Sequence, residues 1–272
     1  MIIEPIRFGH SHREMLGMLT APEQGAQNVA VLFCNPFGQE AIRSKPMYRT
    51  FADRMAREGV PSLRFDYHGT GDSPGSGDVQ TMAAWVHDTI EAARTVVEVT
   101  GATQLHLFGL ALGANIAARA ALALTPAPVR LVLWEPIVDG AAYIDVMLQA
   151  HRKELSIAFG ERWERIRIRL AEPEPTVPGV VLGFPIGEDL HEELCALALP
   201  DFAALTAQGT RIDCAARGQY ENDVQAMHSV VWHPPGPVLN WMANEAHGTA
   251  IVPREVQTVL FNGLLRPESV LR

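Results

Sequence analysis

Hydrophobic residues along this chain of 272 amino acids follow two alternating patterns. A continuous apolar run occupies residues 28–34, and mostly apolar runs occupy residues 105–110 and 129–134, as is typical of strands that are buried in a sheet. Between these runs, apolar residues return at helical spacing over residues 47–57 and 81–100. Strands that alternate with helices in this way predict an α/β fold, with a mostly parallel central sheet and helices on both faces.

Shorter segments extend this predicted sheet at both ends of the chain. Residues 1–20 alternate loosely between apolar and polar positions, which indicates two antiparallel strands at a sheet edge. Residues 62–66, 211–218 and 229–233 predict further strands, and residues 253–264 predict a final helix. No internal repeat or low-complexity tract interrupts the pattern, so one domain core is expected.

The alternation of strands and helices stops between residues 140 and 208. Residues 141–170 predict one long or broken helix, a proline-rich stretch follows, and residues 188–199 predict a second helix. We therefore expect an inserted helical lid at residues 140–208 on a core formed by residues 1–139 and 209–272.

The turn after the apolar run at 105–110 contains a motif with chemical meaning, Gly109-Leu110-Ala111-Leu112-Gly113. Its spacing is that of the nucleophile elbow Gly-x-Ser-x-Gly, in which a strained strand-to-helix turn presents the nucleophile. The flanking glycines remove the Cβ atoms that would otherwise collide in that turn. Ala111 occupies the nucleophile position, and its methyl group cannot attack a carbonyl. The sequence thus predicts the geometry of a serine hydrolase without its nucleophile.

A second loop of interest, residues 35–38, follows the run at 28–34 and reads Asn-Pro-Phe-Gly. A loop in this place can turn backbone N–H groups toward a reacting oxygen. The expected oxyanion-hole donors are the backbone N–H of Phe37 and that of Leu112, which follows the elbow residue.

The elbow, the loop at 35–38 and the glycine-rich turn at residues 66–73 together resemble the α/β-hydrolase superfamily. More narrowly, residues 133–143 look like a subgroup of hydrolases associated with exosortase systems, and like the serine aminopeptidase-like hydrolases. The resemblance covers residues 28–145, and some members of that subgroup also lack the elbow serine. In the oxyanion loop, Asn-Pro replaces the usual His-Gly. The resemblance implies an α/β-hydrolase fold with an inserted lid.

In α/β-hydrolases the catalytic triad comes in the chain order nucleophile, acid, histidine. Following that order, Glu221 is the predicted acid and His247, after the last strand, is the predicted base. A histidine held by a carboxylate suits this role because its pKa lies near the working pH and the acid fixes its tautomer. Asp223 and Asp139 are alternative acids, and Asp213 lies in the strand before Glu221.

Charge and composition narrow the possible partners. The net charge is −9, and no cluster of Lys and Arg is present, which argues against nucleic acid and anionic membrane surfaces as partners. No apolar run reaches the ~18 residues of a membrane span, and the first residues do not form a secretion signal. We therefore expect a cytoplasmic protein, whose oligomeric state the sequence leaves open.

No cofactor or metal is expected. The three cysteines, Cys34, Cys195 and Cys214, lack metal-ligand spacing and predict free thiols in a reducing compartment. His68 and His233 are interpreted as structural or surface residues. The glycine-rich turn is not followed by the Gly-Lys-Ser/Thr of a phosphate-binding loop, so nucleotide binding is not expected there.

Two functional hypotheses remain. In the first, a form with serine at position 111 transfers acyl groups as an esterase, thioesterase or acyltransferase, and this chain is an inactive Ser-to-Ala variant. The apolar lid then favours a small hydrophobic acyl substrate, with Tyr143, Leu182 and Phe184 as the predicted substrate-binding residues. In the second, Ala111 is native, and the protein is a non-hydrolytic binding protein, or an acid–base or cyclisation catalyst that uses His247 without a covalent step.

Overall fold

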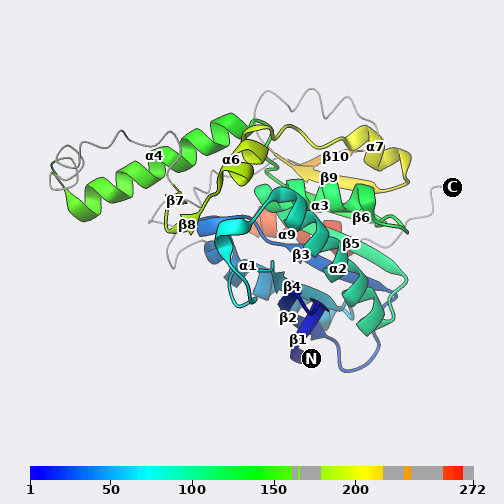
Figure 1. Ribbon diagram of the computed structural model, residues 1–272. Coiled ribbons are helices and arrows are strands. Elements are labelled where there is room, and N and C mark those ends of the chain that lie inside the picture. Colours follow the sequence, from blue (N-terminus) through cyan, green and yellow to red (C-terminus); the bar gives the residue numbers. More distant parts are fainter. Residues whose placement is uncertain (161–164, 166–178, 217–229, 234–253, 266–272) are drawn as a thin grey trace.

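The computed structural model describes residues 1–160, 165, 179–216, 230–233 and 254–265. Its main feature is a central sheet in the order β1-β2-β4-β3-β5-β6-β9-β10, with helices on both faces (Figure 1). The pairs β1–β2 and β2–β4 are antiparallel, and all pairs from β4 to β10 are parallel. The predicted α/β fold with a mostly parallel sheet and an antiparallel edge is confirmed. The strands are β1 (Ile2–His10), β2 (Arg13–Ala21), β3 (Val29–Cys34), β4 (Ser62–Asp66), β5 (Gln104–Leu110), β6 (Arg130–Trp134), β9 (Arg211–Ala215) and β10 (Val230–His233).

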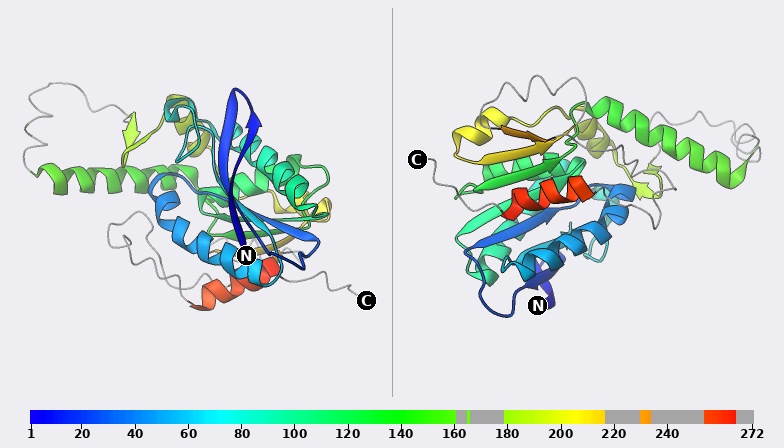
Figure 2. Two further views of the ribbon diagram at one scale, coloured as in Figure 1. Left: turned by 90° about the horizontal axis from the view of Figure 1, so that it is seen from below. Right: turned by 180° about the vertical axis from the view of Figure 1, so that it is seen from behind.

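The helices form a layer on each side of this sheet. Helices α1 and α9 cover one face, and α2, α3 and α7 cover the other (Figure 2). Two two-residue strands form a separate small hairpin near α4. The bounds of these elements are α1 (Gly38–Arg57), α2 (Met82–Thr100), α3 (Leu112–Ala123), α4 (Gly140–Phe159), β7 (Val180–Val181), β8 (Phe184–Pro185), α6 (Glu188–Cys195), α7 (Phe202–Ala207) and α9 (Arg254–Leu265).

Strand β3 shows why the apolar runs are continuous. Side chains alternate between the two faces of a strand. Ala30, Leu32 and Cys34 belong to the hydrophobic cluster under α2 and α3, whereas Val31 and Phe33 belong to the cluster under α1 and α9. All five are fully buried. A strand with helices on both faces therefore needs apolar residues at successive positions.

Helix α1 differs from its prediction. It begins at Gly38 rather than at residue 47, and it continues through Pro46. Proline in a helix interior lacks the N–H that would bond the preceding turn, which favours a helix start after it. Here the turns before Pro46 bury Glu40, Arg43 and Ser44 against the rest of the protein, and this packing offsets the cost of the proline.

Helix α4 projects from the body of the molecule in all views (Figures 1 and 2). It forms the described part of the long helix predicted for residues 141–170, of which residues 161–164 and 166–170 lie outside the described residues.

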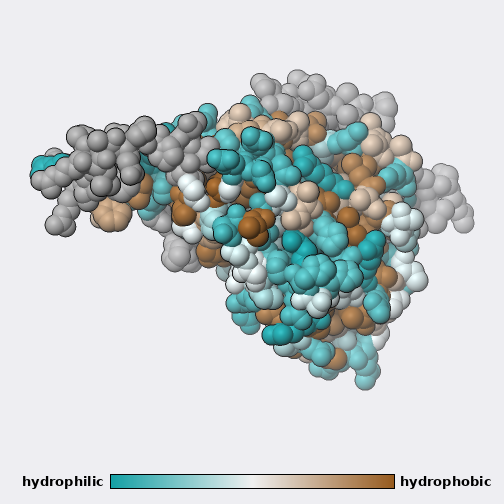
Figure 3. Space-filling view, viewed as in Figure 1, coloured by the Kyte–Doolittle hydropathy of each residue, from teal (hydrophilic) through white to brown (hydrophobic). Residues whose placement is uncertain are grey.

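On the face drawn in Figure 3, hydrophobic residues occur in small groups between hydrophilic ones. Among the described helices, none is long and apolar enough to cross a membrane.

Replacement of Pro46 by alanine is expected to raise the free energy of unfolding by about 2 kcal/mol. The change restores a helix hydrogen bond and removes a ring clash worth ~3 kcal/mol, less ~1 kcal/mol for the greater freedom of the unfolded chain. Urea unfolding monitored by circular dichroism measures the difference. Arg49→Ala, at another exposed position of the same helix, is the control and should change stability little. Equal stability of the Pro46→Ala variant and the starting protein would contradict the expectation.

Candidate active site

Ala111 lies at the turn between β5 and α3 and has the strained backbone expected of a nucleophile elbow. Its φ is 49° and its ψ is −123°, a region that residues with a side chain rarely adopt. Two hydrogen bonds hold the turn: the Ala111 N–H donates to the Trp134 carbonyl oxygen at 2.9 Å, and the Ala111 carbonyl accepts from the Ala114 N–H at 2.9 Å. The surrounding sheet and helix therefore fix a conformation that alanine alone would avoid.

The two glycines of the motif are required by close backbone contacts. A Cβ atom on Gly109 would lie closer than 3.0 Å to the backbone of Gly113 and Ala114. A Cβ atom on Gly113 would lie equally close to the carbonyl groups of Cys34 and Asn35. The first contact lets α3 fold back over β5. The second brings the beginning of α3 against the loop that follows β3.

Two hydrogen bonds to Asn35 anchor that loop. The Tyr67 hydroxyl donates to the Asn35 carbonyl at 2.9 Å, and the Asn35 side-chain amide donates to the Phe65 carbonyl at 2.5 Å. Among the described residues, the N–H groups of Phe37 and Leu112 donate to no protein acceptor. Both predicted oxyanion donors thus lie on backbone segments that meet beside Ala111, with their N–H groups available.

The hairpin β7–β8 covers this loop. The Phe184 ring lies with its centroid 5.8 Å from that of Phe37, and it also packs against Gly38. The Leu182 carbonyl accepts a hydrogen bond from the Gln39 side chain at 3.2 Å. A cavity of about 10 Å³ remains between the loop, the hairpin and α4. This volume admits about one water molecule. The predicted substrate-binding residues Leu182 and Phe184 therefore pack closely against the loop at this point.

The sequence analysis missed the buried carboxyl group of Glu40, which lies in the first turn of α1. The hydroxyl of Tyr143, predicted to bind substrate, donates to Glu40 Oε2 at 2.9 Å. Burial raises the pKa of Glu40 to about 7, the hydrogen bond from Tyr143 lowers it, and the charge of Glu135 raises it further. Glu40 was missed because its segment was interpreted as a loop before a later helix. An acidic residue in a first helical turn was the available signal.

Two of the carboxylates weighed as triad acids have structural partners. The Asp213 carboxylate accepts from Arg130 at 2.5 Å and lies 2.9 Å from Nε2 of His233. Burial acts to raise the pKa of Asp213, but the hydrogen bond from His233 and the charge of Arg130 bring it below its ordinary value. Asp139 caps α4, because its side chain accepts from the Ala142 N–H at 2.9 Å. His233 thus has a buried carboxylate as its partner.

The remaining predicted triad residues, Glu221, Asp223 and His247, lie outside the described residues. Their positions relative to Ala111 stay predictions. In the described part of the chain, the three cysteines are free thiols, with Cys34 and Cys214 buried. No group of three His, Cys, Asp or Glu side chains within those described ranges is arranged to hold a metal ion.

The sequence matches the model of the serine aminopeptidase S33 family over residues 29–185, which is more than half of the chain. The chain therefore belongs to this family of α/β-hydrolases. The matched region contains the loop at residues 35–38, the elbow and the hairpin β7–β8. No curated protein matches the sequence. Membership in the family supports an enzyme of the hydrolase kind.

Solved structures with the same fold are similar over nearly the whole chain. A proline iminopeptidase of Mycobacterium smegmatis is 15% identical with a TM-score of 0.60, and the match covers 96% of this chain and 97% of that one. An esterase of Pyrococcus furiosus is 13% identical with a TM-score of 0.60, covering 97% and 90%. A lidless α/β serine hydrolase of Xanthomonas campestris is 16% identical with a TM-score of 0.54, covering 96% and 93%. At these identities, the likeness shows the α/β-hydrolase fold alone.

Replacement of Ala111 by glycine is expected to raise the free energy of unfolding by about 1 kcal/mol. Relief of a positive-φ conformation is worth ~1–3 kcal/mol, and the added freedom of glycine in the unfolded chain takes back ~0.5–1 kcal/mol. Chemical denaturation measures the change. Ala117→Gly, at a buried helical position of α3, is the matched control and should lose ~1 kcal/mol. Equal losses in the two variants would show that the elbow holds no strain.

The variant Glu40→Gln is expected to change how stability depends on pH. With a pKa raised from 4.5 to about 7, folded Glu40 keeps its proton over a range in which the unfolded chain has lost it. The protein therefore loses stability as the pH rises from 4.5 to 7, by up to about 3 kcal/mol in total. Glutamine removes this loss and still accepts from Tyr143.

Urea unfolding of both proteins at pH values from 5 to 8 (~1 unit beyond the pKa at the upper end) tests this expectation. Relative to the starting protein, Glu40→Gln should gain stability as the pH rises from 5 to about 7, and the difference should level off above the folded pKa. Glu98→Gln, at an exposed position of α2, is the control and should follow the starting protein. Parallel pH profiles for Glu40→Gln and the starting protein would contradict the assignment.

Proposed function

We propose that this chain carries the framework of a serine hydrolase with alanine at the nucleophile position. In the form with serine at position 111, the reaction is acyl transfer from an ester, thioester or amide to water. The observation that supports this most is the backbone of Ala111, because a φ of 49° in a residue flanked by two required glycines is a costly conformation. In α/β-hydrolases, this turn exposes the nucleophile side chain at the end of the strand, at the top of the sheet.

The proposed role of each residue follows from its position in the α/β-hydrolase fold. The serine hydroxyl would attack the carbonyl carbon while His247, oriented by Glu221, takes the hydroxyl proton. The N–H groups of Phe37 and Leu112 would stabilise the negative oxygen of the tetrahedral intermediate. Collapse of that intermediate would release the alcohol, thiol or amine, which takes the proton from His247. Water would then hydrolyse the acyl-enzyme by the same route.

With Ala111, the chain is proposed to be an inactive Ser-to-Ala form of this enzyme. Removal of the serine from a serine hydrolase lowers turnover by about a millionfold, because no other group forms the acyl-enzyme. What remains is the capacity to bind a substrate beside the oxyanion loop. An intact substrate would then be held rather than cleaved.

The proposed substrate is a small molecule with a hydrophobic acyl group. Besides Leu182 and Phe184, the side chains of Val181 and Met147 line the small cavity at the oxyanion loop. The hairpin β7–β8 packs on Phe37 and leaves only about 10 Å³ beside the loop, so we propose that it moves when substrate enters. We therefore propose residues 140–208 as the cap that opens over the site, although within these bounds α7 packs on α3 and β9.

A second candidate function takes Ala111 as the native residue. The buried carboxyl group of Glu40 favours it, because burial brings its pKa to about 7. A group with such a pKa exchanges protons efficiently near neutral pH without forming a covalent intermediate. In this alternative, the protein is a non-hydrolytic member of the family, acting in binding or in acid–base or cyclisation chemistry with His247.

The variant Ala111→Ser is expected to form a single covalent adduct with a fluorophosphonate probe, and the starting protein is expected to form none. The serine oxygen attacks phosphorus and fluoride leaves, which requires an activated hydroxyl and an oxyanion hole. Intact-mass spectrometry followed by peptide mapping locates the adduct.

The double variant Ala111→Ser/His247→Ala is the control for the base. It should label at least about a hundredfold more slowly, because the hydroxyl then lacks its general base. An adduct that forms at the same rate without His247 would remove that residue from the triad. No adduct on a folded Ala111→Ser protein would favour the second candidate function.

A further inference from the structure

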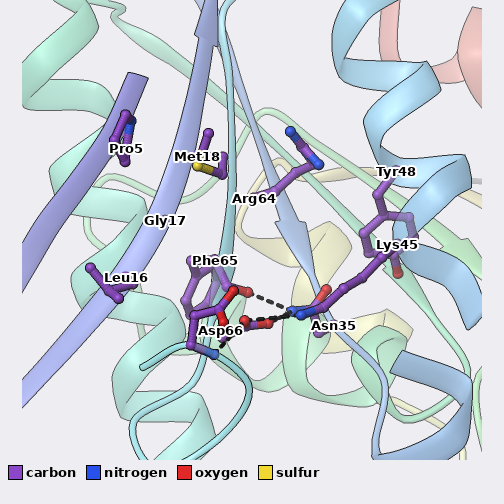
Figure 4. A pocket seen from close by; sticks show the side chains of 11 residues that line it. Pro5, Leu16, Gly17, Met18, Asn35, Lys45, Tyr48, Arg64, Phe65 and Asp66 are labelled. Carbon is purple, nitrogen blue, oxygen red and sulfur yellow. Dashed lines mark hydrogen bonds and ion pairs between the residues drawn. The ribbon is translucent and has the colours of Figure 1, made fainter. Parts of the chain in front are cut away.

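A second cavity lies away from the elbow, between the N-terminal hairpin β1–β2 and helix α1 (Figure 4). Its volume is about 360 Å³, within the range of small-molecule sites, which runs from ~300 to ~1,000 Å³. Asn35, whose backbone abuts α3 beside the elbow, forms one wall. The serine-hydrolase proposal makes no use of this cavity.

The cavity contains an arginine without an ion-pair partner. Figure 4 shows the Arg64 side chain extending from β4 between Met18 and Tyr48. Among the described residues, its guanidinium group makes no hydrogen bond or ion pair, and its Nε atom is buried. Burial lowers the pKa of Arg64, the charge of Asp53 acts against that shift, and the charge of Arg49 adds to it. A guanidinium group that is partly removed from water gains from an anionic partner that fits its planar fork.

Of the other charged residues at the cavity, Lys45 and Asp66 pair with each other, and the Asp72 side chain is exposed. The Lys45 ammonium lies 3.0 Å from Asp66 Oδ2, and this carboxylate also accepts from the Asn35 side chain at 3.2 Å and from the Asp72 N–H at 3.0 Å. Arg64 is therefore the one cation lining the described cavity that lacks an ion pair. A single anionic charge would match it, whereas a dianion such as phosphate would meet the carboxylates of Asp66 and Asp72.

Apolar side chains make up most of the remaining wall. Leu16 and Met18 of β2 line the cavity beside Pro5 of β1, and Phe65 lies below Met18 (Figure 4). Met18 is the register partner of both Pro5 and Arg64, so the apolar wall runs directly up to the guanidinium group. The occupant that fits this wall has an apolar body next to its anionic group.

We propose that this cavity is a binding site for a small organic monocarboxylate. Its carboxylate pairs with the Arg64 guanidinium, and its hydrocarbon part lies against Leu16 and Met18. Such a site is separate from the proposed hydrolytic centre, and it requires neither a nucleophile at position 111 nor catalytic turnover.

Titration of the unmodified, ¹⁵N-labelled protein with hexanoate, followed by amide chemical shifts, tests the proposal. Saturable shifts are expected at the backbone N–H groups of Gly17 and Asn35, which line the cavity. Hexanamide has the same hydrocarbon chain without the charge and should bind at least about tenfold more weakly, the effect of losing a charge-assisted pair. Inorganic phosphate should give no saturable shift there. Equal binding of hexanoate and hexanamide, tighter binding of phosphate, or no saturation by hexanoate would each overturn the proposal.

Two arginine variants then test whether the Arg64 guanidinium is the group that pairs with the carboxylate. Arg64→Gln should weaken hexanoate binding by at least about tenfold, because the paired cation is lost. The matched control is Arg57→Gln, an exposed arginine of α1 that does not line the cavity, and its hexanoate affinity should stay unchanged. The dispersion of the amide spectrum shows whether each variant is folded. If Arg64→Gln does not fold, the comparison of hexanoate with hexanamide on the unmodified protein still decides the matter.

Discussion

The close approach of backbone segments around Ala111 is the constraint on which the site depends. Helix α3 can begin directly after β5 only because Gly109 and Gly113 lack side chains, and Gly113 also admits the backbone that follows β3. The sheet and α3 then hold Ala111 at a positive φ at a cost of ~1–3 kcal/mol. One tight turn thus brings the strand, the helix and the oxyanion loop to a single point, and the family match covers all three.

The segment after β6 is connected to the region of the elbow by two contacts, a packing of aromatic rings and a hydrogen bond. Phe184 packs on Phe37 through their rings, and Tyr143 donates to the buried carboxyl group of Glu40. Both contacts link residues of the proposed cap to α1 or to the loop before it. Movement of the proposed cap would therefore change the packing of the loop at residues 35–38 and the environment of a carboxyl group whose pKa burial raises to about 7. In this proposal, access to the site is coupled to the protonation of Glu40.

The sequence by itself determined the layers of the fold and the place of the elbow. Continuous apolar runs such as 28–34 arise because a strand covered on both faces has no position that meets water, and the helices between them repeat at a different period. The elbow was readable because the spacing of Gly109 and Gly113 reflects a local steric rule. Phe37 was predicted from its place in the loop after β3, and Gly113 contacts the start of that loop at Cys34 and Asn35.

Only the tertiary structure decided where polar groups find partners. Tyr143 and Glu40 are 103 positions apart along the chain, and Asp213 meets Arg130 across 83 positions, so no local pattern announces either contact. Helix α1 likewise begins before Pro46 because burial in the folded protein outweighs a local preference. The periodicity of hydrophobic residues and the steric limits of turns act over a few residues, so the sequence alone reveals them. The burial of a side chain, its pKa and the pairing of its charge depend on which distant segments come into contact. Only the tertiary structure determines those contacts.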